Sequence, residues 1–158
     1  MIVTKLVSKD FIILPLHSSN AEGVILELLA PLEKAGAITS SEHCLHSILK
    51  RERRMSTAVG KGVALPHGLS SEVNEVYVVL GISKNGIDFR AVDNLLCHIF
   101  VLMISPQAQP EKHLKVLTRF TKLLSDGDMR SALLEAQTVE QVLEIFKEQE
   151  NRDDEDSF

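Results

Sequence analysis

Two long apolar runs in the middle of the chain limit its fold most narrowly. Residues 76–82 and 95–104 are almost continuously hydrophobic, interrupted by Gly81 in the first run and by His98 in the second. A strand with one face in water would alternate apolar and polar residues, whereas a continuous run predicts a strand buried on both faces. Both runs are too short to cross a bilayer, so we expect no membrane insertion. The fold must therefore cover both faces of a sheet that contains these strands.

Helical patterns stand before and after these strands along the chain. Residues 18–20 are favourable N-cap residues, and apolar residues then recur at helical spacing up to Gly36. Pro31 falls inside this pattern and predicts a kink or a break. Further helices are expected over residues 39–54, 111–124 and 129–136, and from residue 138 onward.

This order of elements predicts a single α/β domain, with a mixed central β-sheet flanked by helices on both faces. We expect the domain to comprise residues 1–148 and the polar, acidic residues 149–158 to form a flexible tail. The sequence Lys84-Asn85-Gly86 predicts a turn after the first central strand.

Charge and cysteine content narrow the class of protein. The formal net charge of the 158-residue chain is -5, whereas a nucleic-acid-binding protein is more often basic. We therefore expect no nucleic-acid partner. The chain has two cysteines, so we expect no disulfide framework. Because its start does not resemble a secretory signal, we expect a cytoplasmic location. Nothing in the sequence calls for a cofactor.

One short stretch, Met55–Gly68, is typical of a functional site. Its apolar run Val63-Ala64-Leu65 predicts a short strand that stops at Pro66, which fixes φ and has no N–H to donate. His67 follows, beside Gly68. The stretch predicts either an imidazole held ready for chemistry or a histidine that only caps a strand. Gly60-Lys61-Gly62 lacks the spacing of a nucleotide-binding P-loop.

Two other side chains could act with this imidazole. Arg51, at the basic end of a predicted helix, could hold phosphate oxygens in a bidentate fork or could simply lie in solvent. His113 lies in the first turn of a later helix, where free N–H groups favour an anion. The alternative is an exposed histidine without a role.

Other chemical groups are weaker candidates. His43, Cys44 and His46 do not share a helix face well, and two histidines alone do not make a zinc site, so we expect no metal. Asp88 and Asp93 are expected at turns and strand boundaries. Cys44 and Cys97 do not lie in a Gly-rich phosphate loop.

Three segments together resemble a known family. Arg51-Glu52 followed by residues 56–68 is similar to the active-site segment of fructose/mannitol-type EIIA domains of the bacterial sugar phosphotransferase system, which include stand-alone nitrogen-regulatory EIIA proteins. Residues 86–93 resemble the family's Asp-Phe-x-Ala-x-Asp segment, and residues 100–124 its second active-site segment. The resemblance extends from about residue 5 to about residue 147.

The resemblance implies a phosphorelay protein with a mixed sheet between two helical layers. His67 would accept a phosphoryl group as a tele-phosphohistidine, with His113 and Arg51 as active-site companions. Gly68 would support the phosphate pocket, and Ser56 and Thr57 would either donate hydrogen bonds in that pocket or only shape the turn. The Gly-Lys-Gly turn would leave clearance beside the phosphorylated side chain. The donor would be HPr or an HPr-like phosphocarrier.

Several roles remain compatible with this resemblance. The protein could pass the phosphoryl group to a IIB partner as a sugar-specific transport component, or it could use its phosphorylation state to regulate other proteins. It would in either case be a phosphoryl carrier rather than an enzyme that turns over a small molecule. A non-phosphorylated anion-binding module of the same fold is the third alternative.

Overall fold

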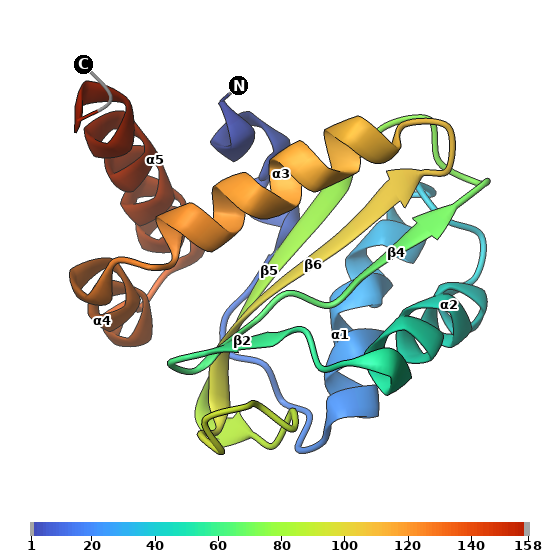
Figure 1. Cartoon of the computed structure of the whole chain (residues 1–158), viewed down its shortest axis with the longest axis horizontal. Helices are drawn as coiled ribbons and strands as arrows, with labels where there is room; N and C mark the ends of the chain where they lie inside the picture. Colours follow the sequence, from blue (N-terminus) through green and yellow to red (C-terminus); the bar gives the residue numbers. More distant parts are fainter. Residues whose placement is uncertain (1, 157–158) are drawn as a thin grey trace.

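The structure is a computed structural model that describes residues 2–156. Its centre is a mixed β-sheet with helices on both faces (Figure 1). The elements in chain order are η1 (Val3–Leu6), η2 (Lys9–Phe11), β1 (Ile12–Ile13), α1 (Ala21–Lys34), α2 (Ser41–Arg54), β2 (Ala58–Gly60), β3 (Val63–Ala64), β4 (His67–Ser70), β5 (Tyr77–Ile87), β6 (Cys97–Pro106), α3 (Pro110–Leu123), α4 (Gly127–Glu135) and α5 (Val139–Asp156). The predicted fold class is confirmed.

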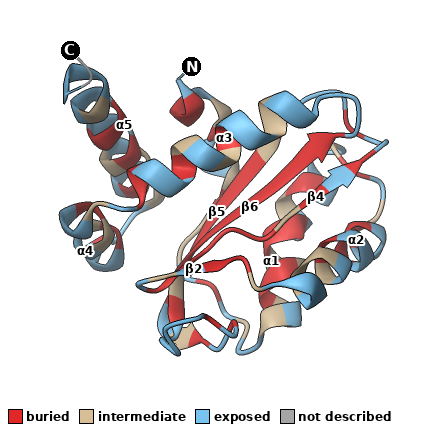
Figure 2. Cartoon of the chain, in the orientation of Figure 1, coloured by how far each residue is buried: buried red, intermediate tan, exposed pale blue. Residues whose placement is uncertain are grey.

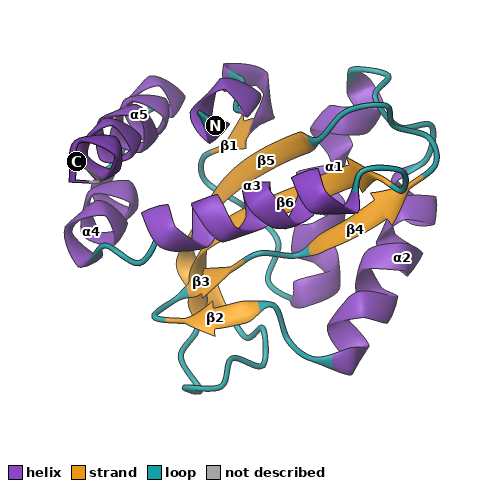
Figure 3. Ribbon diagram, turned by 45° about the horizontal axis from the view of Figure 1, so that its top comes forward, coloured by secondary structure: helices purple, strands orange, loops and turns teal. Residues whose placement is uncertain are grey.

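The two apolar runs form the central antiparallel pair, β5 and β6, with Leu80 opposite Val101. Strand β1 lies parallel to β5 on one side. On the other side β3 and β4 follow one another along the same edge of β6, both parallel to it, and β2 pairs with β3. Figure 3 shows β4 at the edge of the sheet, between α3 and α2.

Side chains of β6 alternate between two hydrophobic clusters, one on each face. Val101 and Met103 belong to the cluster that includes residues of α3, α4 and α5. Phe100 and Leu102 belong to the cluster that includes residues of α1 and α2. All four are buried, as the continuous red of β6 in Figure 2 shows. The run of apolar residues is therefore explained by burial on both faces, as expected.

Strand β5 is longer than expected, and the predicted turn at residues 84–86 is wrong. The strand continues to Ile87, with a shift in register between Ile82 and Ile87. Gly86 has φ +81°, so the irregularity is absorbed in a conformation that suits glycine. The Lys84 ammonium donates to the Leu134 and Ala136 carbonyls at the end of α4, which ties this part of the strand to the helical layer.

Helix α1 begins and ends where the sequence predicts, but it does not break at Pro31. The Asn20 side chain accepts a hydrogen bond from the Gly23 N–H, and Gly36, with φ +76°, follows the helix end. Helical hydrogen bonding resumes beyond the proline, where the Ala35 N–H donates to the Pro31 carbonyl. The buried residues Leu28, Leu29 and Leu32 hold this segment against the core.

The acidic C-terminal segment is helical over its described part. Helix α5 continues to Asp156, and Glu150 is only 1% exposed. Its carboxylate accepts hydrogen bonds from the Val3 and Thr4 N–H groups, each at 3.0 Å, and from the Thr4 hydroxyl at 2.7 Å. Arg119 of α3 also donates to it, at 3.3 Å. Helix α5 therefore runs through residue 149, where the sequence predicted that a flexible tail begins, and residues 157–158 lie outside the described part.

Within residues 2–156, no helix combines the length and hydrophobicity needed to cross a membrane.

Candidate active site

His67 is the first residue of β4, whereas the sequence predicted only that it follows a strand ending at Pro66. Pro66 separates β3 from β4, and both strands still pair with β6. The Pro66 carbonyl accepts a hydrogen bond from the Met103 N–H at 3.0 Å, so the proline bridges the two strands without leaving the sheet. His67 lies opposite Met103 and is half-buried at the sheet edge. The rigid sheet thus fixes the position of the imidazole.

A backbone carbonyl fixes the protonation of the His67 ring. Nδ1 lies 2.8 Å from the Leu65 carbonyl oxygen. A carbonyl can only accept, so Nδ1 must carry the hydrogen. In the neutral ring Nε2 then holds the free lone pair, which makes Nε2 the nucleophilic nitrogen.

His113 lies beside His67, although the two residues are 46 positions apart in the sequence. Their ring centroids are 5.2 Å apart, with an angle of 58° between the ring planes. His113 is in the first turn of α3, which has Pro110 as its first residue. Its Nδ1 lies 2.7 Å from the hydroxyl oxygen of Ser105, at the end of β6. Helix α3 and the sheet together therefore make a histidine pair.

Both imidazoles are held neutral. Burial lowers the pKa of His67, and the positive charge of Arg51 lowers it further, against an opposing effect of the Leu65 carbonyl. Burial, with a smaller contribution from His67, lowers the pKa of His113 to about 4. Near neutral pH the pair thus offers lone pairs and N–H donors without positive charge.

The resemblance implies phosphoryl acceptance at His67, and these shifts predict how its rate would respond to acid. Protonation of His67 removes its lone pair, and its pKa lies below the ordinary value of 6.5. We expect the rate to stay constant as the pH falls through 6.5 and to decline only at more acidic values. The measurement is the initial rate against pH with a donor saturating throughout, and a midpoint at or above 6.5 would contradict the assigned environment.

Arg51 lies in the last turn of α2, and its positive charge contributes to lowering the pKa of His67. One of its N–H groups donates to the Met55 carbonyl at 2.8 Å. This bond caps the helix end and restrains the guanidinium. Among described residues it is the one hydrogen bond of that group, so other donors of the fork remain available for an anion.

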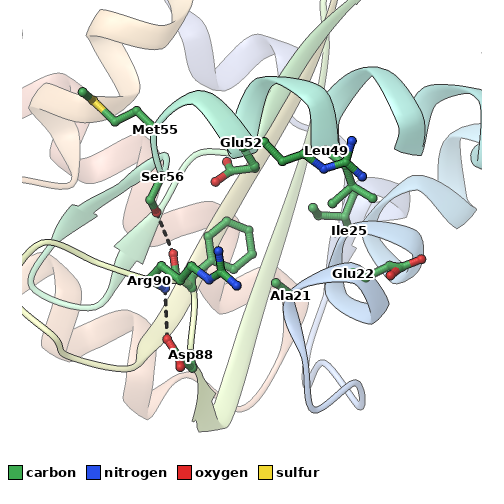
Figure 4. Close-up of a pocket in the computed structure, with 11 residues that line it drawn as sticks. Ala21, Glu22, Ile25, Leu49, Glu52, Met55, Ser56, Asp88 and Arg90 are labelled. Carbon is green, nitrogen blue, oxygen red and sulfur yellow. Dashed lines mark hydrogen bonds between the residues drawn. The ribbon is translucent and has the colours of Figure 1, made fainter.

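Ser56 and Thr57 hold the chain rather than face the histidines. The Ser56 hydroxyl donates to the Phe89 carbonyl at 2.6 Å, and it lines a separate pocket of about 380 Å³ between α1, the end of α2 and residues 88–90 (Figure 4). The Thr57 hydroxyl and N–H both bond the carboxylate of Glu52. These contacts favour the alternative that both residues shape the turn after α2.

The glycines of the motif allow close packing at Gly68 and a tight turn at residues 60–62. A Cβ on Gly68 would lie 3.2 Å from Ile48 and 3.3 Å from Ser47, so glycine lets β4 approach α2 closely. Gly60, Lys61 and Gly62 all have positive φ and form the turn between β2 and β3. The Lys61 N–H donates to the Asp93 carboxylate at 2.7 Å.

The Gly-Lys-Gly turn is consequently remote from His67, contrary to the expected clearance beside the phosphorylated side chain. The Gly62 carbonyl accepts hydrogen bonds from the N–H groups of His98 and Ile99, near the start of β6, whereas His67 pairs near the end of that strand.

Asp88 lies at a turn, as expected, and its carboxylate accepts a hydrogen bond from the Arg90 N–H (Figure 4). Over the described residues, no group of three or more His, Cys, Asp or Glu side chains has the arrangement of a metal site.

Sequence reasoning missed two groups that hydrogen-bond the histidines, the Leu65 carbonyl and the Ser105 hydroxyl. The Leu65 carbonyl carries no signal in the sequence, because every residue has a carbonyl and its direction depends on the strand break at Pro66. Ser105 is visible only as the last polar residue before Pro106. Its contact with His113 forms only when α3 packs over the end of β6.

Comparison with known proteins identifies the family to which this site belongs. Residues 5–149 match the family model described as "Phosphoenolpyruvate-dependent sugar phosphotransferase system, EIIA 2". The chain belongs to this family. The EIIA chain is 31% identical over 148 residues to the fructose-specific EIIABC component of Bacillus subtilis, an alignment that covers 94% of this chain but 23% of that relative. It is 30% identical over 148 residues to a nitrogen regulatory protein of Bradyrhizobium diazoefficiens, covering 92% and 95% of the two chains.

A solved structure agrees with the EIIA fold. The crystal structure of nitrogen regulatory protein IIA-Ntr from Neisseria meningitidis superposes with a TM-score of 0.85 at 22% identity, covering 92% of this chain and 99% of the other. At that identity the likeness supports the fold alone. The family match and the relatives together assign the chain to the phosphotransferase system, in which a phosphorelay role fits the family.

Proposed function

We propose that His67 accepts a phosphoryl group on Nε2 from HPr or an HPr-like carrier and passes it on. The observation that carries this proposal is the hydrogen bond from His67 Nδ1 to the Leu65 carbonyl, because it leaves Nε2 as the nucleophile. His113 lies next to the ring, and the positive charge of Arg51 acts on it.

The transfer itself requires alignment and charge stabilisation more than covalent chemistry from the protein. The Nε2 lone pair attacks phosphorus, the bond between phosphorus and the donor breaks, and the donor keeps that electron pair. The ring keeps its Nδ1 hydrogen and so becomes positively charged, which the Leu65 carbonyl stabilises through its hydrogen bond. A phosphoryl group on such a ring leaves readily, so the same site can donate to the next carrier.

The surface around the histidines suits a protein partner. Each element of the site presents an exposed apolar side chain: Met55 after α2 is 69% exposed, Leu69 in β4 is 40% exposed and Leu114 in α3 is 63% exposed. Exposed apolar groups beside a polar centre are typical of protein docking surfaces. A solved complex joins enzyme IIAMTL with phosphorylated enzyme IIBMTL from Escherichia coli, and the former superposes on this chain with a TM-score of 0.75 at 22% identity. We propose a IIB domain or a regulated protein as the acceptor.

The direct test uses purified enzyme I, HPr and phosphoenolpyruvate with the wild-type chain. We expect one phosphoryl group per chain, labile in acid and stable in base, as for a phosphohistidine. Adding unphosphorylated HPr in excess should return the label to HPr, because the carrier works in both directions. Absence of labelling with HPr and with the HPr-like carrier of the nitrogen branch would reject the phosphorelay proposal.

Arg51→Ala should slow phosphoryl acceptance by about a hundredfold, since it removes a charged donor next to the transferring group. Arg51 is at a helix end and half-buried, so we expect little change in the unfolding midpoint. Arg54→Ala, which removes an exposed arginine from the same helix end, is the matched control and should keep the wild-type rate. Equal rates for both variants would remove Arg51 from the site.

A further inference from the structure

Ser105 makes a contact that the motif does not assign. It lies near the carboxyl end of β6 opposite Leu69 of β4, and it is 0% exposed. Its hydroxyl oxygen lies 2.7 Å from Nδ1 of His113. The sheet positions this hydroxyl under the first turn of α3, where it contacts the side of the His113 ring away from Nε2.

The direction of this hydrogen bond follows from the surroundings of the hydroxyl. A serine hydroxyl can donate or accept, whereas a carbonyl only accepts. If His113 Nδ1 donated, the Ser105 hydrogen would need another acceptor, and among described residues the hydroxyl bonds nothing but His113. A buried donor without an acceptor is costly. The Ser105 hydroxyl therefore donates to Nδ1, and neutral His113 carries its hydrogen on Nε2.

The two histidines thus hold opposite tautomers. His67 carries hydrogen on Nδ1 and has a lone pair on Nε2, because its partner is the Leu65 carbonyl. His113 carries hydrogen on Nε2, because its partner is a hydroxyl that donates. We propose that Ser105 is a positioning residue that holds His113 as an uncharged Nε2–H donor to the phosphoryl group on His67. This inference rests on the proposed function.

This tautomer of His113 avoids electrostatic repulsion between its Nε2 and the phosphoryl oxygens. In the other tautomer the lone pair of His113 Nε2 would be turned toward the anionic phosphoryl oxygens and would repel them. With the Nε2 hydrogen in place, His113 stabilises the phosphoryl group during transfer without becoming an imidazolium. A neutral donor also avoids holding the phosphoryl group too tightly for onward transfer.

Nitrogen-15 NMR of the unphosphorylated protein tests the tautomer directly. At neutral pH we expect wild-type His113 to show a protonated Nε2 and an unprotonated Nδ1, and His67 to show the reverse. In Ser105→Ala the His113 signals should move toward those of the exposed His43 and His46, which serve as internal references for freely exchanging tautomers. Ser105→Thr keeps the hydroxyl and should restore the wild-type pattern. A protonated Nδ1 on His113 in the wild type would overturn the inference.

The rate of phosphoryl acceptance from phosphorylated HPr gives the second readout. Ser105→Ala should slow it about tenfold, less than removal of a direct donor would, and Ser105→Thr should recover it. Ser83→Ala removes another buried strand hydroxyl, whose partner is the Gly86 N–H, and should leave the tautomers and the rate unchanged. An unchanged tautomer and rate in Ser105→Ala would also overturn the inference. If the wild type is not phosphorylated at all, the proposed function fails, and the tautomer measurement still decides the role of Ser105.

Discussion

His67→Ala should abolish phosphoryl acceptance completely, because no other group in the site has the same combination of position and free lone pair. His113 lies next to it, but its outer nitrogen carries hydrogen and its pKa is lowered to about 4, so it is a weak nucleophile. Intact-mass spectrometry after incubation with enzyme I, HPr and phosphoenolpyruvate measures the result. The variant should stay unmodified under conditions that convert the wild type fully.

The chain contains a well-matched control for this substitution. His98 is also a half-buried strand histidine, and its Nδ1 lies 2.8 Å from the Ser83 carbonyl, the same distance as in the His67 bond to Leu65. It lies near the opposite end of β6, away from Arg51 and His113. His98→Ala should therefore be phosphorylated like the wild type. Modification that persists in His67→Ala, or that is lost in His98→Ala, would contradict the assignment.

Glu150→Ala should lower the free energy of unfolding by about 3–5 kcal/mol, the largest stability effect that we expect. The substitution leaves the buried N–H groups of Val3 and Thr4 and the Thr4 hydroxyl without their acceptor. It also removes one of two carboxylates that bond the mostly buried Arg119, the other being Asp154. Urea unfolding followed by circular dichroism measures the change. Glu148→Ala, two residues earlier on an exposed part of α5, should change the midpoint little.

The contribution of Glu150 should also depend on pH in a defined direction. Burial alone would raise its pKa, but the hydrogen bonds from Thr4, Val3 and Arg119 outweigh burial and hold the pKa below its ordinary value of 4.5. The stabilisation is therefore fully present above pH 4.5 and is lost as the pH falls through the lower, folded value. The difference between wild type and Glu150→Ala should shrink in acid, and a difference that is the same at neutral and strongly acidic pH would argue against this account.

The sequence predicts the layers of the fold well because burial on both faces leaves a strong pattern. The apolar runs that become β5 and β6 need no tertiary information to be recognised. The errors occur where a long-range contact decides the outcome. Residues 84–86 continue β5, and Lys84 bonds the end of α4, a contact between distant parts of the chain. Residues 149–156 stay helical although they are polar, since the carboxylate of Glu150 binds the other end of the chain.

The site is predictable in its residue types but not in its protonation. His67, His113 and Arg51 follow from the resemblance of the motifs, and the fold brings the two histidines together. The tautomers depend on a backbone carbonyl and a strand hydroxyl, whose directions no residue pattern encodes. Ser56, Thr57 and Gly68 belong to the same motif, yet their contacts stabilise the scaffold around the site.

The most direct test of the account is to identify the nitrogen that carries phosphorus. The wild-type chain, labelled with nitrogen-15 in its histidine rings, is phosphorylated through HPr and examined by NMR for coupling between phosphorus and a ring nitrogen. The account predicts coupling to Nε2 of His67, with Nδ1 of the same ring still protonated by virtue of its bond to the Leu65 carbonyl. Coupling to Nδ1 of His67, or to either nitrogen of His113, would contradict it.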